Sequence, residues 1–342
     1  MTAPQAPQPK SDLPREFAFI RRHFAALAGP AALNLRDDAA VFLPSAGREM
    51  VMAVDAMVEN VHFLPTDPPD LIGRKLLRCN LSDLAAMGAV PEGWLLAFAR
   101  PPHITEDWVA QFCIGLAQDQ AVFGLSLMGG DTTSTSGPLV LSLTIVGSVT
   151  SGQAIRRCGA RAGDGLWVTG TIGDGALGLR ALQGPVPLPD PTGYLAQRYR
   201  LPQPRVGLPL YGMASAAMDV SDGLVQDAGH LARENALHVR ICADKVPLSA
   251  PARAAGESWL QTCLTGGDDY EILFAVPPEQ EQQLLSHPYL PTRCGDVPVT
   301  RIGPLEQGSP SVPGVDGAGR ALHSKPSGWS HLSRLPTPCI RR

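Results

Sequence analysis

Lysine is scarce in this sequence, and the Cys-x-x-Cys motif is absent from it. Lysine occurs only at positions 10, 75, 245 and 325, so arginine carries most of the positive charge, and the formal net charge is −4. A weakly acidic chain argues against a nucleic-acid surface, and we expect no nucleic-acid partner. The seven cysteines include no Cys-x-x-Cys. This pattern argues against a disulfide framework or zinc knuckle and favours a reducing compartment.

The sequence also lacks a long apolar run. No stretch approaches the ~20 consecutive apolar residues that a membrane-spanning helix needs, and residues 1–10 do not resemble a signal peptide. We therefore expect a cytoplasmic protein without a membrane partner, beginning with a disordered leader over residues 1–14. The 342 residues, 44% of them apolar, are enough for two domains. We expect an N-terminal domain over residues 15–151 and a C-terminal domain over residues 152–342.

Hydrophobic periodicity predicts alternating helices and strands. Helices are expected over residues 15–28, 71–87, 105–123, 176–182 and 224–236. Strands are expected over residues 39–43, 49–54, 139–146, 166–169, 214–220 and 272–276. This alternation indicates an α/β (α+β) fold. We also expect Asp70 to cap the second helix, and residues 183–207 and the tail from residue 304 to be irregular.

The most informative stretch is Met128-Gly129-Gly130-Asp131-Thr132-Thr133, which is expected to form a turn before a strand. Glycines let backbone N–H groups approach an anion closely, and a carboxylate beside them can reach phosphate through a divalent cation. A second copy, Gly266-Gly267-Asp268-Asp269, also precedes a strand, while no Walker A motif is present. Taken alone, the first stretch fits a plain turn with a capping Asp better than a metal–phosphate site.

Carboxylates recur at strand ends, helix faces and glycine turns along the chain. They are Asp37, Asp38, Asp55, Asp83, Asp131, Asp219 and Asp222. Because the sequence has no His-Glu-x-x-His motif, the expected donors are oxygens, which select hard ions such as Mg²⁺. Several Mg²⁺ ions without a Walker lysine indicate phosphoryl transfer, since positioning and charge neutralisation carry most of that reaction.

Seven short motifs follow one another along the chain. They are Asp37-Asp38-Ala39-Ala40-Val41, Asp55 with Val58-Glu59-Asn60-Val61-His62-Phe63, Asn80 to Ala89, Gly129 to Thr133, Gly163 to Gly170, Met218 to Leu224 and Gly266 to Glu271. In this series they resemble the thiamine-monophosphate kinase family. The resemblance covers about residues 15–276, with Trp329 beyond it. It implies two α/β domains of the aminoimidazole-ribonucleotide-synthetase type and a homodimer that pairs through its N-terminal domains. It also implies ATP-dependent conversion of thiamine monophosphate to thiamine diphosphate.

The resemblance further implies roles for single residues. The implied Mg²⁺ ligands are Asp38, Asp55, Asp83, Asp131, Asp219 and Asp222. The implied ATP contacts are Gly130, Asp131, Arg157 and Ser221, and the implied substrate contacts are His62, Asp268 and Trp329. We expect Asp131 and Asp222 to be essential for turnover. A phosphate monoester has a second pKa of about 6 and is mostly ionised at neutral pH, so direct in-line attack on the ATP γ-phosphorus without a strong base or a phospho-enzyme is expected.

Two alternatives stay open. One is another ATP-using enzyme of the same superfamily. A selenophosphate synthetase would need a reactive cysteine or selenocysteine near the N-terminus, but the first cysteine is Cys79, and a hydrogenase-maturation enzyme would end in cysteine, but three residues follow Cys339. The other is a non-catalytic nucleotide-binding relative, because Ala53-Val54 replaces a hydroxyl pair that is usual in the family before the strand-end Asp.

Overall fold

The computed structural model describes residues 15–183, 188 and 190–315. The expected leader and Trp329 therefore lie outside the described residues. No helix among those described is long and apolar enough to cross a membrane.

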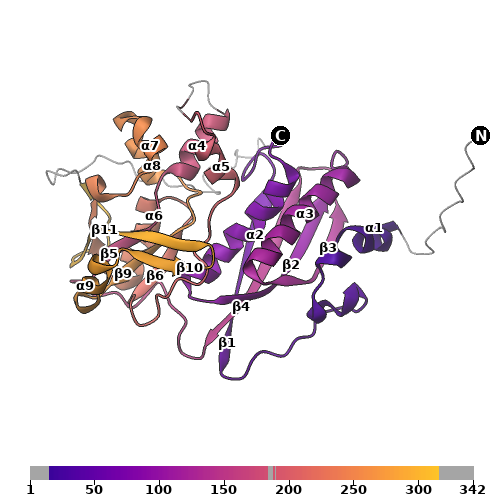
Figure 1. Ribbon diagram of the computed structural model, residues 1–342, viewed down its shortest axis with the longest axis horizontal. Helices are drawn as coiled ribbons and strands as arrows, with labels where there is room; N and C mark the ends of the chain where they lie inside the picture. Colours follow the sequence, from indigo (N-terminus) through magenta and orange to yellow (C-terminus); the bar gives the residue numbers. More distant parts are fainter. Residues whose placement is uncertain (1–14, 184–187, 189, 316–342) are drawn as a thin grey trace, which may run out of the picture.

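The N-terminal half is a four-stranded sheet covered on one face by two helices (Figure 1). The sheet has the order β1-β4-β2-β3, and β2 and β3 are parallel while the other neighbours are antiparallel. Its elements are α1 (Arg15–His23), η1 (Ala25–Leu27), η2 (Pro30–Leu35), β1 (Arg48–Val58), α2 (Pro69–Ala86), β2 (Val90–Arg100), α3 (Glu106–Phe123), β3 (Ser126–Ser134) and β4 (Val140–Thr150). The helices α2 and α3 pack against each other over the sheet.

The ends of the two covering helices follow from their sequences. The Thr105 hydroxyl accepts a hydrogen bond from the Trp108 N–H at 3.1 Å and caps α3. Gly124, at φ 72°, ends α3, and Gly88, at φ 71°, directly follows the end of α2. Glycine adopts this left-handed conformation without the cost that a side chain imposes. Both helices were therefore predicted to within two residues.

The C-terminal half contains helices and strands, and most of its strands belong to one main sheet. Its strands are β5 (Gly165–Thr169), β6 (Ala216–Val220), β7 (Leu237–Val239), β8 (Ile241–Cys242), β9 (Glu271–Val276), β10 (Tyr289–Thr292), β11 (Gly295–Gln307) and β12 (Gly314–Val315). Its helices are α4 (Asp174–Gln183), α5 (Tyr194–Arg200), α6 (Leu224–Asn235), η3 (Ala243–Lys245), α7 (Ala250–Ala254), η4 (Glu257–Trp259), α8 (Leu260–Thr265) and α9 (Pro278–Ser286). The main sheet has the order β10-β11-β5-β9-β6, with β7 added on β11, and β8 pairs with β12.

The two halves meet along α2. This helix contacts β6, β9 and α5 of the C-terminal half as well as its own sheet. One apolar cluster continues from Leu77 and Leu81 on α2 to Ile272 and Phe274 on β9. Because α2 is covered from both sides, polar residues on it must find partners inside the protein.

Four local expectations were wrong. Residues 39–43 form no strand, and Val41 and Leu43 are 67% and 95% exposed, because an apolar run alone does not supply a partner strand. Asp70 lies in the first turn of α2 and Pro68 holds the cap position. The Pro-rich stretch 183–207 contains α5, and β11 continues through residue 304.

Candidate active site

Four of the predicted metal ligands lie together where the two halves meet. Asp55 is on β1, Asp83 is on α2, and Asp219 and Asp222 lie at the end of β6. Burial raises the pKa of Asp83 to about 8, with the Asp219 and Asp55 carboxylates adding to the shift. Burial also raises the pKa of Asp219 to about 6, and burial and Asp222 raise that of Asp55. We call these four residues the acidic cluster.

The acidic cluster fits a divalent cation. The donors of the acidic cluster are carboxylate oxygens. The exposed guanidinium of Arg157 lowers the pKa values of Asp83 and Asp219 and so partly counters the effect of burial. Ligand atoms of Asp222, Asp227 and His230 lie within 4.8 Å of one another, and burial together with repulsion from Asp222 or from one another raises the pKa values of Asp55, Asp83 and Asp219. A cation between such carboxylates would relieve that repulsion. Hard oxygen donors of this kind suit Mg²⁺. The structure thus brings Arg157, an expected ATP contact, to the same place.

A fifth carboxylate, Asp227 on α6, was not predicted as a site residue. Its Oδ2 accepts hydrogen bonds from the N–H groups of Asp222 and Gly223, both at 3.1 Å. Burial, with Asp219 and Asp222, raises the pKa of Asp227 to about 8. Because Asp227 binds the N–H groups of the turn, the side chain of Asp222 does not cap α6. Oδ2 of Asp222 instead accepts a hydrogen bond from Nε2 of Gln226 at 2.8 Å. The spacing of Asp222 and Asp227 is the signal that could have revealed this pair.

Asn80 on α2 fixes the position of β1 relative to α2, the two elements that carry Asp55 and Asp83. This side chain is fully buried, and its Oδ1 accepts a hydrogen bond from the N–H of Asp55 at 3.2 Å. Its Nδ2 donates to the carbonyl of Leu76 at 2.9 Å. Asn80 therefore fixes the backbone of Asp55, one predicted ligand, and lies one turn of α2 away from Asp83, another predicted ligand. Asp55 lies inside β1, which runs on to Val58, and not at the strand end that the sequence suggested.

The second Gly-Gly-Asp segment lies beside the turn that carries Ser221 and Asp222. The N–H of Asp268 donates to the carbonyl of Ser221 at 2.9 Å, and that of Tyr270 donates to Val220 at 2.8 Å. A Cβ on Gly267 would lie 2.2 Å from the Ser221 oxygen, so only glycine allows this approach. Ser221, an expected ATP contact, thus lies between the acidic cluster and Asp268.

Two residues that we expect to contact the substrate, His62 and Asp268, lie together with Lys75. The Nζ of Lys75 donates to the carbonyl of His62 at 3.1 Å and to Oδ2 of Asp268 at 3.5 Å. The same ammonium lies 3.7 Å from the ring centroid of Tyr199. The imidazole of His62 accepts the Val58 N–H at its Nδ1, at 2.9 Å. Sequence reasoning missed Lys75 and Tyr199, because their partners are distant along the chain.

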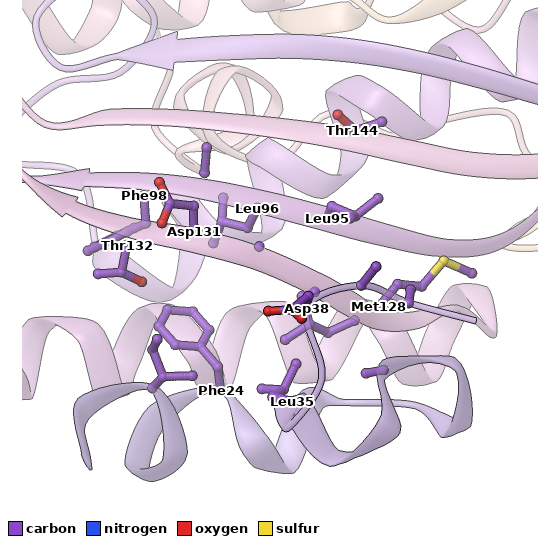
Figure 2. Close-up of a pocket in the computed structure, with 18 of the residues that line it drawn as sticks. Phe24, Leu35, Asp38, Leu95, Leu96, Phe98, Met128, Asp131, Thr132 and Thr144 are labelled. Atoms are coloured by element: carbon purple, nitrogen blue, oxygen red, sulfur yellow. The ribbon is translucent and has the colours of Figure 1, made fainter. Parts of the chain in front are cut away.

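Asp38, Asp131 and Gly130 lie elsewhere, in a pocket of about 510 Å³ beside β3. Figure 2 shows Asp38 and Asp131 among the residues that line it, between the sheet and the segment that carries Phe24 and Leu35. The expected turn is wrong: Met128 to Thr133 lies within β3, and neither glycine has a positive φ. A Cβ on Gly130 would lie 2.1 Å from the Leu96 oxygen, so glycine is needed for the close approach of β3 to β2.

Strand pairing separates Asp131 from the acidic cluster within one chain. Asp131 is in line with Ala97 and Ser142, whereas Asp55 is in line with Leu143, the next residue along β4. Successive residues of a strand point to opposite faces, so the two carboxylates point to opposite faces of the sheet. They also lie on opposite edge strands, three strand spacings or about 14 Å apart. The structure therefore divides the six predicted ligands into two groups.

The fold and sequence match known proteins. The family described as "AIR synthase related protein, N-terminal domain" matches residues 36–149. Thiamine-monophosphate kinase of Caulobacter vibrioides is 42% identical over 95% of this chain and 93% of its own, and that of Bacillus subtilis is 33% identical over 79% and 84%. The hydrogenase maturation protein HypE in complex with ATP has a TM-score of 0.71 but 16% identity, over 92% of this chain and 97% of its own, and shows the fold alone.

Two solved kinases support the expected α/β fold of the aminoimidazole-ribonucleotide-synthetase type, which is confirmed. The enzyme from Stenotrophomonas maltophilia has a TM-score of 0.73 and 38% identity, covering 84% of this chain and 91% of its own. AaThiL, complexed with AMPPCP and TMP, has a TM-score of 0.73 and 29% identity, covering 86% and 91%. The fold, the acidic cluster and these matches together show that this chain, an enzyme of the kinase class, belongs to the thiamine-monophosphate kinase family.

Proposed function

We propose that this protein transfers the γ-phosphate of ATP directly to thiamine monophosphate and releases thiamine diphosphate and ADP. The observation that carries the proposal is the acidic cluster, which lies beside the contact between Asp268 and Lys75 where the two halves meet. The proposed Mg²⁺ site thus adjoins residues expected to hold the acceptor. The AaThiL complex with AMPPCP and TMP supports the same pair of ligands.

The acidic cluster would hold Mg²⁺ through Asp55, Asp83, Asp219 and Asp222. Bound there, the ions would supply positive charge that neutralises the phosphates of both substrates. The exposed guanidinium of Arg157 lies near the cluster and can add to this neutralisation. The burial of Asp219 and the tie from Asn80 to Asp55 keep the carboxylates in place before substrate arrives.

The chemical step needs little acid–base catalysis. The acceptor phosphate is mostly ionised at neutral pH, since its second pKa is about 6. One of its oxygens forms a bond to the γ-phosphorus while the bond from that phosphorus to the bridging oxygen of ADP breaks, and ADP keeps the electron pair. The main task of the site is therefore to bring two polyanions together in line.

We further propose that the protein is a homodimer that pairs through the uncovered face of its N-terminal sheet. Met52 and Val54 on β1 are 67% and 62% exposed there. Contiguous exposed apolar surface of this kind is typical of an interface. The pocket that holds Asp38 and Asp131 is also lined by Thr144, which is in line with Val54 on β1, so pairing through this face would place Asp131 at the interface. Such a dimer would unite the two groups of predicted ligands, and we expect it to be cytoplasmic.

The test is release of ADP by purified protein with Mg²⁺, ATP and thiamine monophosphate. We expect release that depends on this acceptor and fails with free thiamine, which would distinguish the enzyme from a thiamine pyrophosphokinase. Asp222→Asn and Asp131→Asn should each abolish turnover, whereas Asp107→Asn, an exposed position on α3, should not. Tight ATP binding without ADP release would instead identify a non-catalytic relative, and full activity in either site variant would contradict the assignment.

A further inference from the structure

Lys75 is a buried cation on α2 that joins three segments distant in the sequence. Its side chain is 3% exposed. Its Nζ lies 3.1 Å from the carbonyl oxygen of His62, 3.5 Å from Oδ2 of Asp268 and 3.7 Å from the centre of the Tyr199 ring. The hydroxyl of Tyr199 donates to the same carbonyl of His62 at 3.3 Å. Lys75 therefore connects the loop after β1, the helix α5 and the loop before β9.

These contacts distinguish Lys75 from a phosphate-binding lysine. An ammonium has three N–H donors. Here a carbonyl, a carboxylate and the face of an aromatic ring each take up part of its charge. Burial lowers the pKa of Lys75, but Asp268 and Tyr199 outweigh this effect and raise it, so the ammonium stays charged. A substrate phosphate would have to displace one of these partners to reach it.

The loop that Lys75 contacts is strained. Asp268 and Tyr270 both have positive φ, 72° and 53°. Such conformations cost about 1–3 kcal/mol each for residues other than glycine and persist where the surroundings hold them. Two backbone hydrogen bonds, to Ser221 and Val220, hold this loop from one side. Lys75 holds the carboxylate of Asp268 from the other side and leaves that side chain 29% exposed.

We propose that Lys75 is a positioning residue that orients the Asp268 carboxylate towards the cationic part of the acceptor substrate. The inference rests on the proposed function, because thiamine monophosphate carries a permanently charged thiazolium ring as well as a phosphate. The exposed edge of the Asp268 carboxylate is the natural partner for such a cation. Lys75 fixes that edge while its own positive charge remains buried, away from the cation.

The experiment compares Lys75→Met with wild type, measuring KM for each substrate and kcat from ADP release. Methionine keeps the length of the side chain but removes the charge. We expect KM for thiamine monophosphate to rise at least about tenfold, while KM for ATP changes by less than about twofold. Arg74→Met is the matched control, because Arg74 is the neighbouring residue on α2 and binds Asp119, which Arg78 also holds. Its kinetic constants should not change.

The outcomes separate this inference from the proposed function. Wild type that releases no ADP with thiamine monophosphate overturns the proposed function. Active wild type, with an unchanged KM or an equal rise for both substrates in Lys75→Met, overturns only the role of Lys75. If Lys75→Met does not fold, Tyr199→Leu removes the ring beneath the ammonium and should still raise KM for thiamine monophosphate selectively, and an unchanged KM there also overturns the proposal.

Discussion

Single carboxylates in the acidic cluster, and Asp227 beside it, oppose folding when no cation is bound. The pKa is raised to about 8 for Asp83 and Asp227 and to about 6 for Asp219, mainly by burial. A carboxyl group whose pKa is higher in the folded state binds more protons there, so the free energy of unfolding falls as pH rises from about 4 to about 8. We expect the melting temperature in EDTA to fall across this range.

Mg²⁺ should counter that loss where the carboxylates are ionised. The gain in melting temperature on adding Mg²⁺ should be larger at about pH 8 than at about pH 6, because protonated carboxyl groups bind the ion poorly. Thermal unfolding with EDTA or Mg²⁺ at several pH values measures both effects. A melting temperature that does not respond to Mg²⁺ at the higher pH would contradict a cation site in this cluster.

Asp83→Asn isolates one of these charges. The amide keeps the shape of the side chain and removes its repulsion of Asp219 and Asp55. We expect the metal-free variant to be more stable than wild type by about 1–3 kcal/mol at pH 8, while ADP release falls at least about a hundredfold. Chemical denaturation in EDTA and the kinase assay provide the two measurements. A variant that loses both stability and activity would indicate a structural role instead.

The sequence was most informative about residues within local motifs. Asp219 and Asp222 could be found because a strand, a short turn and a helix are all encoded within a few positions. Lys75 could not be found this way, because its carboxylate partner is 193 positions away. A lysine inside an apolar helix indicates that a buried partner exists, but only the fold shows which one it is.

At the scale of elements, the close approach of β3 to β2 depends on Gly130. Because a Cβ there would lie 2.1 Å from the Leu96 oxygen, Gly130→Ala must push the two strands apart. We expect a loss of about 2 kcal/mol or more, as for other overpacked sites, together with lower activity. Gly129→Ala is the control, since its nearest neighbour would be 3.9 Å away. Similar melting temperatures for the two variants would contradict this explanation.

Elements were predictable where the chain itself marks their ends. Apolar spacing, Thr105 as a cap and Gly124 as a stop define α3 without reference to the rest of the protein. The helix α5 has no such signals and follows a Pro-rich stretch. It is fixed by tertiary contacts, since Arg198 pairs with Glu271 at 3.0 Å and Arg200 pairs with Asp67 at 2.6 Å. Long-range ion pairs of this kind leave no local pattern in a sequence.

At the scale of the whole molecule, α2 organises the candidate site. Three of its polar residues serve three purposes: Asn80 holds β1, Asp83 joins the acidic cluster, and Lys75 contacts Asp268. They all lie on a helix that contacts both halves. The relative position of the halves therefore determines whether the predicted metal, nucleotide and acceptor residues lie close enough together for the proposed phosphoryl transfer.

The proposed dimer can be tested on the uncovered face of the N-terminal sheet. Val54→Asp places a charge on that face, on the edge strand β1, where the wild-type side chain is 62% exposed. If a second copy covers it, the buried charge should break the dimer, since an unpaired charge removed from water costs several kcal/mol. Light scattering after size exclusion should then give the mass of one chain, and ADP release should fall with it if Asp131 acts across the interface.

Leu285→Asp on α9, where the side chain is 58% exposed, provides the control and should change neither mass nor activity. A Val54→Asp monomer with full activity would show that each chain has a complete site, so Asp131 would then have to reach the acidic cluster within one chain.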